Sequence, residues 1–262
     1  MHKYSVVDIF AGPGGLAEGF SRVQHPDGSR PFRVVLSIEK DPTAHATLRL
    51  RSFLRQFESP PDEYYDFING NCDEPNWSEL YPPEWEKGVE EAWLMELGQE
   101  DPSLRLDNRL DEIRAEGQDR VILIGGPPCQ AYSLVGRARN AGKAGYVPSE
   151  DGRHFLYQEY IRILDRLRPV AFVMENVKGL LSSSVDGRAR IVEQVLSDLS
   201  GDRSEGGKYR LLAIASKATG QIELDAEGPD ARDFLVRAEE FGIPQARHRV
   251  IIVGVREDVA EA

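Results

Sequence analysis

The sequence opens with a short apolar segment that runs directly into a glycine turn. Residues 5–10 (Ser-Val-Val-Asp-Ile-Phe) have the composition of a buried strand, three of the next five residues are glycine, and residues 16–22 have helical character. A strand, a tight glycine turn and a helix in this order begin a βαβ unit of the nucleotide-binding type. This start restricts the chain to α/β folds in which helices connect parallel strands.

The rest of the chain continues this alternation. We expect further strands at 33–39, 66–70, 121–124, 170–174, 209–215 and 250–255, and helices from 41–42 onward and at 155–167 and 191–199. The pattern predicts a doubly wound, Rossmann-like, mostly parallel seven-stranded sheet in one domain over residues 1–262. Ligands bind beyond the carboxyl ends of such strands, and Glu39, Asn71, Cys129 and Glu175 follow or end the predicted strands.

Two polar segments interrupt the alternation. Residues 73–119 carry 15 acidic against 4 basic residues and contain all three tryptophans, and residues 217–231 form a second polar segment. We interpret both as surface insertions. In the first we expect an amphipathic helix with Trp85, Val89, Trp93 and Leu97 along one stripe.

Charge and cysteine content narrow the function classes. The net charge is −12, but the 215 residues outside 73–119 carry 29 acids and 28 bases, so the composition permits a nucleic-acid partner. Two cysteines, Cys72 and Cys129, exclude a disulfide framework and show no metal-ligand spacing, so no metal is expected. Without a long apolar run or a signal-peptide core, we expect a cytoplasmic protein with no membrane segment.

The glycine turn and the acid that follows predict a nucleoside cofactor. Gly12, Gly14 and Gly15 allow close approach to the backbone, and Glu39 can accept hydrogen bonds from ribose hydroxyls. NAD and S-adenosylmethionine would both suit this arrangement. The turn has no basic residue to hold a pyrophosphate, which favours the cofactor without phosphate.

Three further features suggest chemistry. Cys129 follows Gly-Pro-Pro at the end of a predicted strand, where it is either a buried apolar residue or a nucleophile. Glu175 is either a capping or ion-paired acid or a proton donor near neutral pH. In an extended segment, the side chains of Gln245, Arg247 and Arg249 would point to the same side. They form either a solvated strand edge or a set of groups that bind one ligand.

Four segments in one order resemble motifs I, IV, VI and VIII of the DNA cytosine-5 methyltransferase family. They are Asp-Ile-Phe-Ala-Gly-Pro-Gly-Gly at 8–15, Gly-Pro-Pro-Cys-Gln-Ala-Tyr-Ser at 126–133, Glu-Asn-Val at 175–177 and Gln-Ala-Arg-His-Arg at 245–249. The resemblance spans residues 5–255. It implies a class I S-adenosylmethionine-dependent methyltransferase fold that methylates carbon 5 of a flipped-out cytosine in double-stranded DNA.

The resemblance also implies residue roles. Cys129 would attack carbon 6 of the base, Glu175 would bind ring N3, Arg249 would hold the carbonyl oxygen, and Arg247 with Gln245 would support the loop and the DNA backbone. The implied loop and DNA contacts are Gln130, Ser133, Gly136, Arg137, Arg139 and Arg153. The implied cofactor contacts are Phe10, Ala11, Gly12, Pro13, Gly15, Glu39, Lys40, Asn71, Cys72, Gly126, Pro128 and Leu156.

The chain departs from the family pattern in three ways. Asn71 replaces the acid that usually meets the adenine amino group, with Asp73 as a substitute, and Lys40 stands where an aromatic residue often follows the ribose acid. No target-recognition region or C-terminal motif follows residue 255. We therefore expect a truncated chain, or the catalytic subunit of a split enzyme whose partner supplies target recognition.

Two other functions stay open at this point. Methylation of cytosine in tRNA would use the same chemistry, and an inactive binding or assembly subunit belongs to another class of protein. For a bacterial DNA methyltransferase, restriction-modification and a nucleoid association would be the expected setting.

Overall fold

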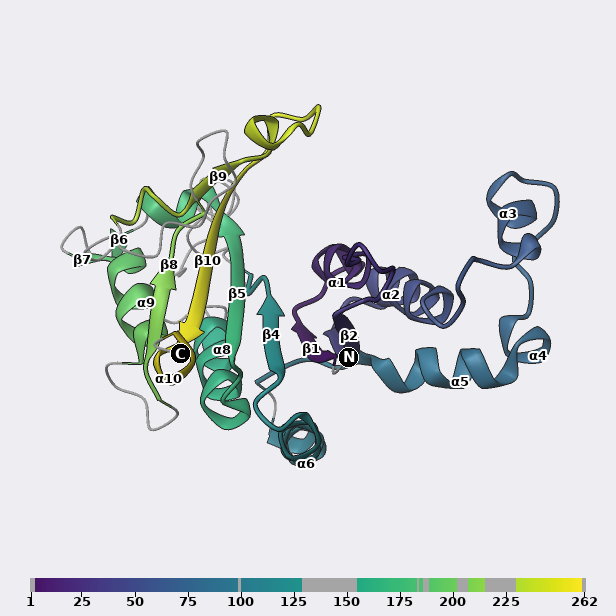
Figure 1. The fold of residues 1–262 in the computed structure, drawn as a ribbon, viewed down its shortest axis with the longest axis horizontal. Helices are drawn as coiled ribbons and strands as arrows, with labels where there is room; N and C mark the ends of the chain where they lie inside the picture. The colour runs from purple at the N-terminus through teal and green to yellow at the C-terminus, as the bar shows by residue number, and fades with distance from the viewer. Residues whose placement is uncertain are drawn as a thin grey trace, which may run out of the picture. The chain divides into compact units, whose positions relative to one another are not determined.

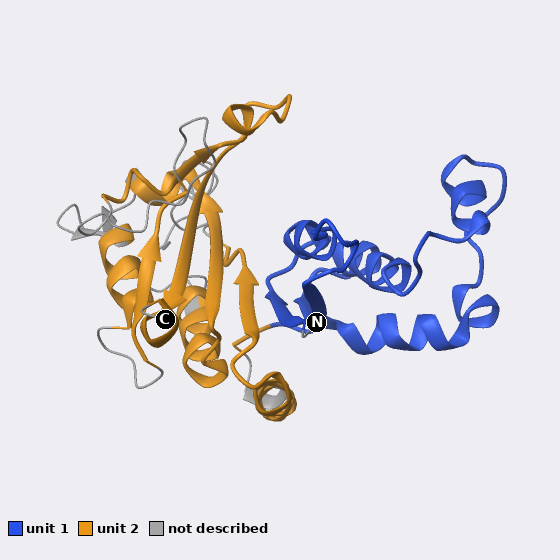
Figure 2. Cartoon of the chain, in the orientation of Figure 1, with its two compact units in different colours: residues 1–96 blue, residues 97–262 orange. Residues whose placement is uncertain are grey.

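The computed structural model describes residues 3–98, 100–128, 155–182, 184–185, 189–201, 207–214 and 230–260. The chain divides into two compact units, residues 1–96 and 97–262 (Figure 2). Among the described residues, no helix is both long and apolar enough to cross a bilayer.

The first unit is an α/β layer built on three parallel strands (Figure 1). Strand β2 lies between β1 and β3, with Val6 opposite Val34 and Ile38 opposite Trp93. The elements in chain order are β1 (Tyr4–Ile9), α1 (Gly15–Ser21), β2 (Phe32–Glu39), α2 (Pro42–Leu54), α3 (Asp62–Ile68), α4 (Trp77–Leu80), α5 (Pro82–Glu91) and β3 (Ala92–Leu94).

Helices α2 and α5 of this unit run side by side (Figure 1), and the side chain of Phe53 on α2 is the centre of an aromatic cluster. Phe53 is fully buried, and its ring lies 5.1–6.1 Å from the rings of Phe57, Trp77, Tyr81 and Trp85. Gly88 of α5 faces the backbone of Phe53, where an added Cβ would lie 2.8 Å from the Phe53 nitrogen. Two of the three tryptophans of the acidic segment, Trp77 and Trp85, therefore pack within the unit.

The second unit has the strand order β4-β5-β10-β8, and β9 pairs with β10. Strands β4 and β5 are parallel, whereas β10 is antiparallel to β5, β8 and β9. The elements are α6 (Glu100–Gly117), β4 (Val121–Gly125), α8 (Phe155–Leu167), β5 (Ala171–Val177), η3 (Lys178–Ser182), β6 (Ser184–Val185), β7 (Ala189–Arg190), α9 (Ile191–Ser200), β8 (Tyr209–Leu212), β9 (Leu235–Arg237), η4 (Ala238–Phe241), β10 (His248–Arg256) and α10 (Glu257–Ala260).

The ladder between β5 and β10 is fixed by a glycine and an aromatic ring. Gly254 lies opposite Phe172, and a Cβ at Gly254 would lie 2.1 Å from a Phe172 ring carbon. The ring therefore occupies the space over the glycine. In the same register, Arg249 pairs with Val177 and Ile251 with Glu175.

The α/β fold class is confirmed, and two local predictions are wrong. Residues 66–70 are not a strand, because α3 extends to Ile68 and Gly70 turns the chain with a φ of 73°. Strand β3 occupies that place beside β2 and lies inside the segment 73–119 that we interpreted as an insertion. The expected helical stripe through Trp93 is also wrong, because α5 ends at Glu91 and Trp93 belongs to β3.

The predicted single domain, with its insertions, stays a prediction, and the boundary between the compact units falls after Glu96, inside residues 73–119. Most of the polar segment 217–231 lies outside the described residues. Strand β5 is longer than expected, so Glu175 lies within the strand and does not follow it.

Candidate active site

The turn between β1 and α1 contains three residues with left-handed backbone conformations. Phe10, Gly12 and Gly14 have φ angles of 56°, 56° and 87°. The Gly14 N–H donates to the Ala11 carbonyl at 2.9 Å and closes the turn. A Cβ at Gly12 would meet no atom of the described residues within 4 Å. The backbone of this turn is therefore open to a ligand.

Glu39, at the end of β2, is fixed against this turn by both carboxylate oxygens. Oε2 accepts the N–H of Gly12 at 2.8 Å, and Oε1 accepts the N–H of Asp41 at 2.7 Å. A carboxylate has about four acceptor sites, so each oxygen can accept a further hydrogen bond. The half-buried carboxylate and the open glycine turn fit a nucleoside whose ribose hydroxyls donate to Glu39.

The other predicted cofactor residues of the first unit lie on its surface. Asn71 donates from Nδ2 to Asp66 Oδ1 at 3.1 Å, so its carbonyl oxygen is the group that can meet a ligand amine. Lys40 forms an ion pair with Glu96 at 3.1 Å, and Cys72 is exposed. Gly126, Pro128 and Leu156 belong to the second unit and are half-buried there.

In the second unit, two arginines meet one carboxylate. Arg249 Nε donates to Glu175 Oε1 at 2.8 Å, and Arg247 Nη2 lies 3.8 Å from the same oxygen. The Glu175 and Arg249 side chains are 25% and 26% exposed, so the pair is accessible from solvent. Since Arg249 lies two residues from Ile251, the cross-strand partner of Glu175, the antiparallel ladder accounts for this contact.

The third member of the predicted trio is placed differently. Gln245 is exposed in the turn before β10, and its backbone N–H donates to the Ile243 carbonyl at 2.8 Å. The turn is closed by the Ala238 N–H, which donates to the Arg247 carbonyl at 2.9 Å. The structure thus brings Arg247 and Arg249 to Glu175 and leaves Gln245 at the surface.

A glycine and a buried amide hold the segment after β4 against Glu175. A Cβ at Gly126 would lie 3.0 Å from Glu175 Oε2, so a larger residue would press on the carboxylate. Asn176, only 7% exposed, donates from Nδ2 to the Pro127 carbonyl at 3.2 Å. Asn176 was not among the predicted site residues. The only sequence signal for its role was its position directly after Glu175.

The predicted nucleophile and loop lie outside the described residues. These residues are Cys129, Gln130, Ser133, Gly136, Arg137, Arg139 and Arg153. Cys129 directly follows Pro128 in the sequence and lies two residues after Pro127, whose carbonyl Asn176 binds. Its role therefore stays a prediction.

Sequence reasoning also missed Asp8, which lies inside β1. Asp8 is fully buried, and neither carboxyl oxygen has a hydrogen-bond partner of normal geometry among the described residues. Burial raises the pKa of Asp8 to about 8, and the nearby backbone N–H of Ala17 and the positive charge of Arg55 offset this rise only in part. The sequence signal for a buried acid was the position of Asp8 between the apolar residues Val7 and Ile9.

An α/β fold with an open glycine turn, an acid ending the second strand and a carboxylate flanked by guanidiniums is typical of Rossmann-like enzymes, many of which bind a nucleoside cofactor. Residues 103–202 match the family model for C-5 cytosine-specific DNA methylase. Over these residues the chain is thus similar to the C-5 cytosine-specific DNA methylases, and the relatives described next extend the likeness along the chain.

Curated relatives match along nearly the whole chain. Type II methyltransferase M.Bpa9945I of Bacillus paralicheniformis is 30% identical over 96% of this chain and 54% of its own length. DNA (cytosine-5-)-methyltransferase M.ApeKI of Aeropyrum pernix is 28% identical over 99% of this chain and 46% of its own length. The chain thus spans about half the length of these relatives, and 71% of type II methyltransferase M.AquIA of Picosynechococcus, which is 26% identical over 96% of this chain.

Among solved structures, the Entamoeba histolytica methyltransferase EhMeth resembles the chain with a TM-score of 0.50 and 15% sequence identity. The alignment covers 97% of this chain and 53% of that one. At this identity the likeness concerns the fold.

Proposed function

We propose that the protein transfers a methyl group from S-adenosylmethionine to carbon 5 of a flipped-out cytosine in double-stranded DNA. The observation that carries the proposal is the contact of Arg249 with Glu175 at 2.8 Å, beside the segment that directly precedes Cys129. The match of residues 103–202 to the C-5 cytosine-specific DNA methylase model supports the reaction class, and the carboxylate and guanidinium pair offers complementary partners for the polar edge of a pyrimidine.

In this proposal Cys129 is the nucleophile. Its thiolate forms a bond to carbon 6 of the cytosine, and the electron pair of the 5,6 double bond becomes available at carbon 5. After methylation, loss of the carbon 5 proton re-forms the double bond, and the Cys129 sulfur leaves. Both faces of the ring must be reached, so the base has to leave the duplex.

Glu175 and Arg249 hold the charge that develops on the ring. Glu175 binds ring N3 and supplies a proton there, while Arg249 binds the carbonyl oxygen. Arg247, 50% exposed and 3.8 Å from Glu175 Oε1, supports the carboxylate from the outside. Both basic side chains meet Glu175 through the same oxygen, so Oε2, on the Gly126 side, is the oxygen available to a ligand.

The first unit would hold the cofactor through the open turn and Glu39. Bound S-adenosylmethionine would supply an electrophilic methyl group. Phe10 and the backbone of residues 12–15 would contact the cofactor, and Glu39 would accept hydrogen bonds from its ribose. The proposal assigns DNA target recognition to a region outside these 262 residues, because the aligned relatives are longer.

Covalent trapping tests the proposal directly. Duplex DNA with 5-fluorocytosine at the target position should form an adduct that survives denaturing electrophoresis, because fluorine cannot leave carbon 5 as the proton does. The protein expressed from its complete reading frame is incubated with this DNA and S-adenosylmethionine. Ordinary cytosine should give product without an adduct. A complete lack of adduct would contradict covalent catalysis, and preferred transfer to tRNA would replace DNA as the substrate.

Glu39→Gln is expected to weaken the binding of S-adenosylhomocysteine by about tenfold, since a hydrogen bond to a charged group contributes about 1.5–3 kcal/mol. Titration calorimetry measures the Kd. Glu86→Gln is the matched control, because Glu86 is an exposed acid on α5 of the same unit and has no assigned cofactor role. Equal affinities of Glu39→Gln and wild type would remove Glu39 from the cofactor site.

A further inference from the structure

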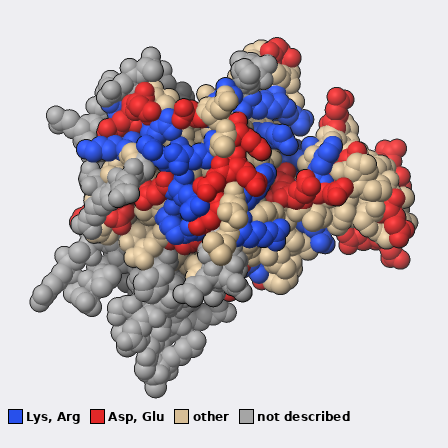
Figure 3. Space-filling view, turned by 90° about the horizontal axis from the view of Figure 1, so that it is seen from below, with Lys and Arg blue, Asp and Glu red and all other residues tan. Residues whose placement is uncertain are grey.

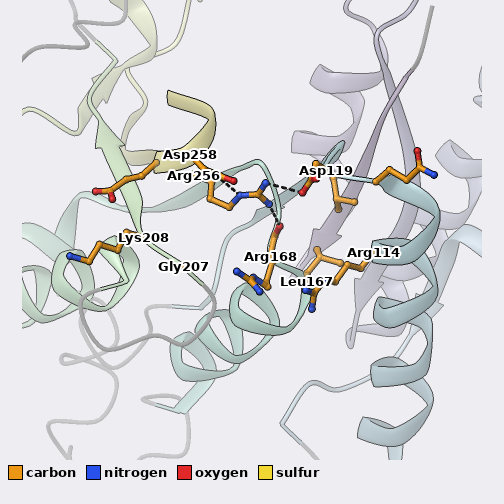
Figure 4. A pocket seen from close by; sticks show the side chains of 11 residues that line it. Arg114, Asp119, Leu167, Arg168, Gly207, Lys208, Arg256 and Asp258 are labelled. Carbon is orange, nitrogen blue, oxygen red and sulfur yellow. Dashed lines mark hydrogen bonds and ion pairs between the residues drawn. The ribbon is translucent and has the colours of Figure 1, made fainter. Parts of the chain in front are cut away.

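A cavity of about 720 Å³ lies in the second unit, where β10 ends (Figure 4). Strand β10 carries Arg249 near one end and Arg256, in the cavity wall, at the other, a span of ~23 Å at 3.3 Å per residue. The ends of α6 and α8 and the segment before β8 complete the wall, contributing Arg114, Gln118, Leu167, Arg168, Gly207 and Lys208.

The backbone around this cavity is strained. Of the four described non-glycine residues with positive φ, three line it: Gln118 (43°), Asp119 (61°) and Arg168 (47°). Arg168 directly follows α8, a position where glycine is the usual residue with this conformation. Arg168 therefore adopts a left-handed backbone conformation that is unfavourable for a residue with a side chain. Backbone strain of this kind clusters at ligand-binding sites.

Arg256 makes most of the polar contacts within the cavity wall. Arg256 is only 12% exposed and forms ion pairs with Asp119 at 2.8 Å and Asp258 at 2.7 Å. Its Nη1 also donates to the Arg168 carbonyl at 2.9 Å, which fixes the strained residue (Figure 4). Two of the three acids in the wall are thus paired with Arg256.

The charged side chains of the wall leave a small excess of positive charge. Four basic residues, Arg114, Arg168, Lys208 and Arg256, line the cavity together with three acids, Asp119, Glu257 and Asp258, although the chain as a whole has a net charge of −12. Arg168 Nη2 lies close to Gly207, where a Cβ would be 3.9 Å away, so its guanidinium lies in the cavity wall. Guanidinium groups bind phosphate oxygens through paired hydrogen bonds.

We propose that this cavity binds the phosphate group of a small phosphorylated ligand, at a site separate from the candidate active site. The surface on this side favours a small ligand over nucleic acid, because basic and acidic side chains are intermixed there (Figure 3). Arg162 and Arg166 of α8, for example, pair with Asp107 and Asp111 of α6, each at 2.7 Å. A duplex would require a more continuous basic surface.

Calorimetric titration with inorganic phosphate, against sodium chloride of equal ionic strength, tests the site. Wild type should bind phosphate, and Arg114→Ala and Arg168→Gly should each weaken the Kd at least tenfold. Arg168→Gly also relieves the positive φ, so its Tm should equal or exceed that of wild type, which separates lost binding from misfolding. Arg109→Ala is the control, because Arg109 lies on α6 outside the cavity and pairs with Glu112.

Three outcomes would overturn the proposal. Heats no larger than those of chloride would show that no phosphate site exists, and an unchanged Kd in both cavity variants would place phosphate elsewhere. Displacement of phosphate by a short DNA duplex, abolished by Arg168→Gly, would reassign the cavity to nucleic acid. Each outcome is independent of methyl transfer, because the assay follows phosphate alone.

Discussion

Cys129→Ala is expected to abolish the covalent adduct with 5-fluorocytosine DNA and to lower the rate of methyl transfer by at least about 10³-fold, because no other group replaces the thiolate. Tritium transfer from labelled S-adenosylmethionine to DNA measures the rate, and denaturing electrophoresis measures the adduct. The affinity for S-adenosylhomocysteine should be unchanged, since the substitution removes a reacting atom and not a cofactor contact.

Cys72→Ala provides the matched comparison. Cys72 is exposed and belongs to the first unit, among the residues predicted to contact the cofactor. This variant should retain the adduct, and any effect on activity should appear in the KM for S-adenosylmethionine. An adduct that persists in Cys129→Ala and disappears in Cys72→Ala would exchange the roles of the two cysteines.

Asp8→Asn is expected to remove a large pH dependence of stability from the first unit. In the unfolded chain Asp8 loses its proton near pH 4, whereas burial in β1 raises its pKa to about 8. The folded state therefore binds more protons than the unfolded state between these values. The contribution of Asp8 is fully present below pH 4 and is lost as the pH rises towards 8. At about 1.4 kcal/mol per pKa unit, the loss by pH 7.5 reaches an upper value of about 5 kcal/mol.

Urea unfolding between pH 5 and pH 8, followed by tryptophan fluorescence, measures this effect, because all three tryptophans lie in the first unit. The midpoint for wild type should fall with pH, and that for Asp8→Asn should change much less. Asp27→Asn is the control: hydrogen bonds from Ser29 hold the pKa of Asp27 below its usual range, so Asp27 stays ionised throughout this pH window. Parallel slopes for wild type and Asp8→Asn would show that Asp8 is ionised in the fold.

The sequence was most informative where local pattern and fold agree. The apolar run and the glycine turn predicted β1 and α1, because strand and turn signals are local. Glu39 was correctly predicted as the last residue of β2. It was misleading at residues 66–70, where the apolar residues of α3 are largely exposed and no buried face distinguishes strand from helix. Strand β3 has three residues and depends on its partner β2, so a scan for local patterns could not detect it.

The candidate site was predictable by residue type but not by contact. The resemblance assigned Glu175, Arg247 and Arg249 to one site. The distances between them depend on the pairing of β5 with β10, and these strands are about 70 residues apart in the sequence. The antiparallel direction of β10 has no sequence signal either. Asp8 and the Asn176 tether were missed because burial and tertiary hydrogen bonds define them.

The pairing of Gly254 with Phe172 has a consequence at the far end of the strand. A slip of β10 by two residues would keep the inward and outward alternation and would bring Arg247 to the place of Arg249, so charge alone could not reject it. Such a slip would instead set Ile252 against the Phe172 ring, where only a hydrogen atom fits. The contact of the Phe172 ring with Gly254 thus fixes the register between β5 and β10. This register determines that Arg249, and not Arg247, forms the close contact with Glu175.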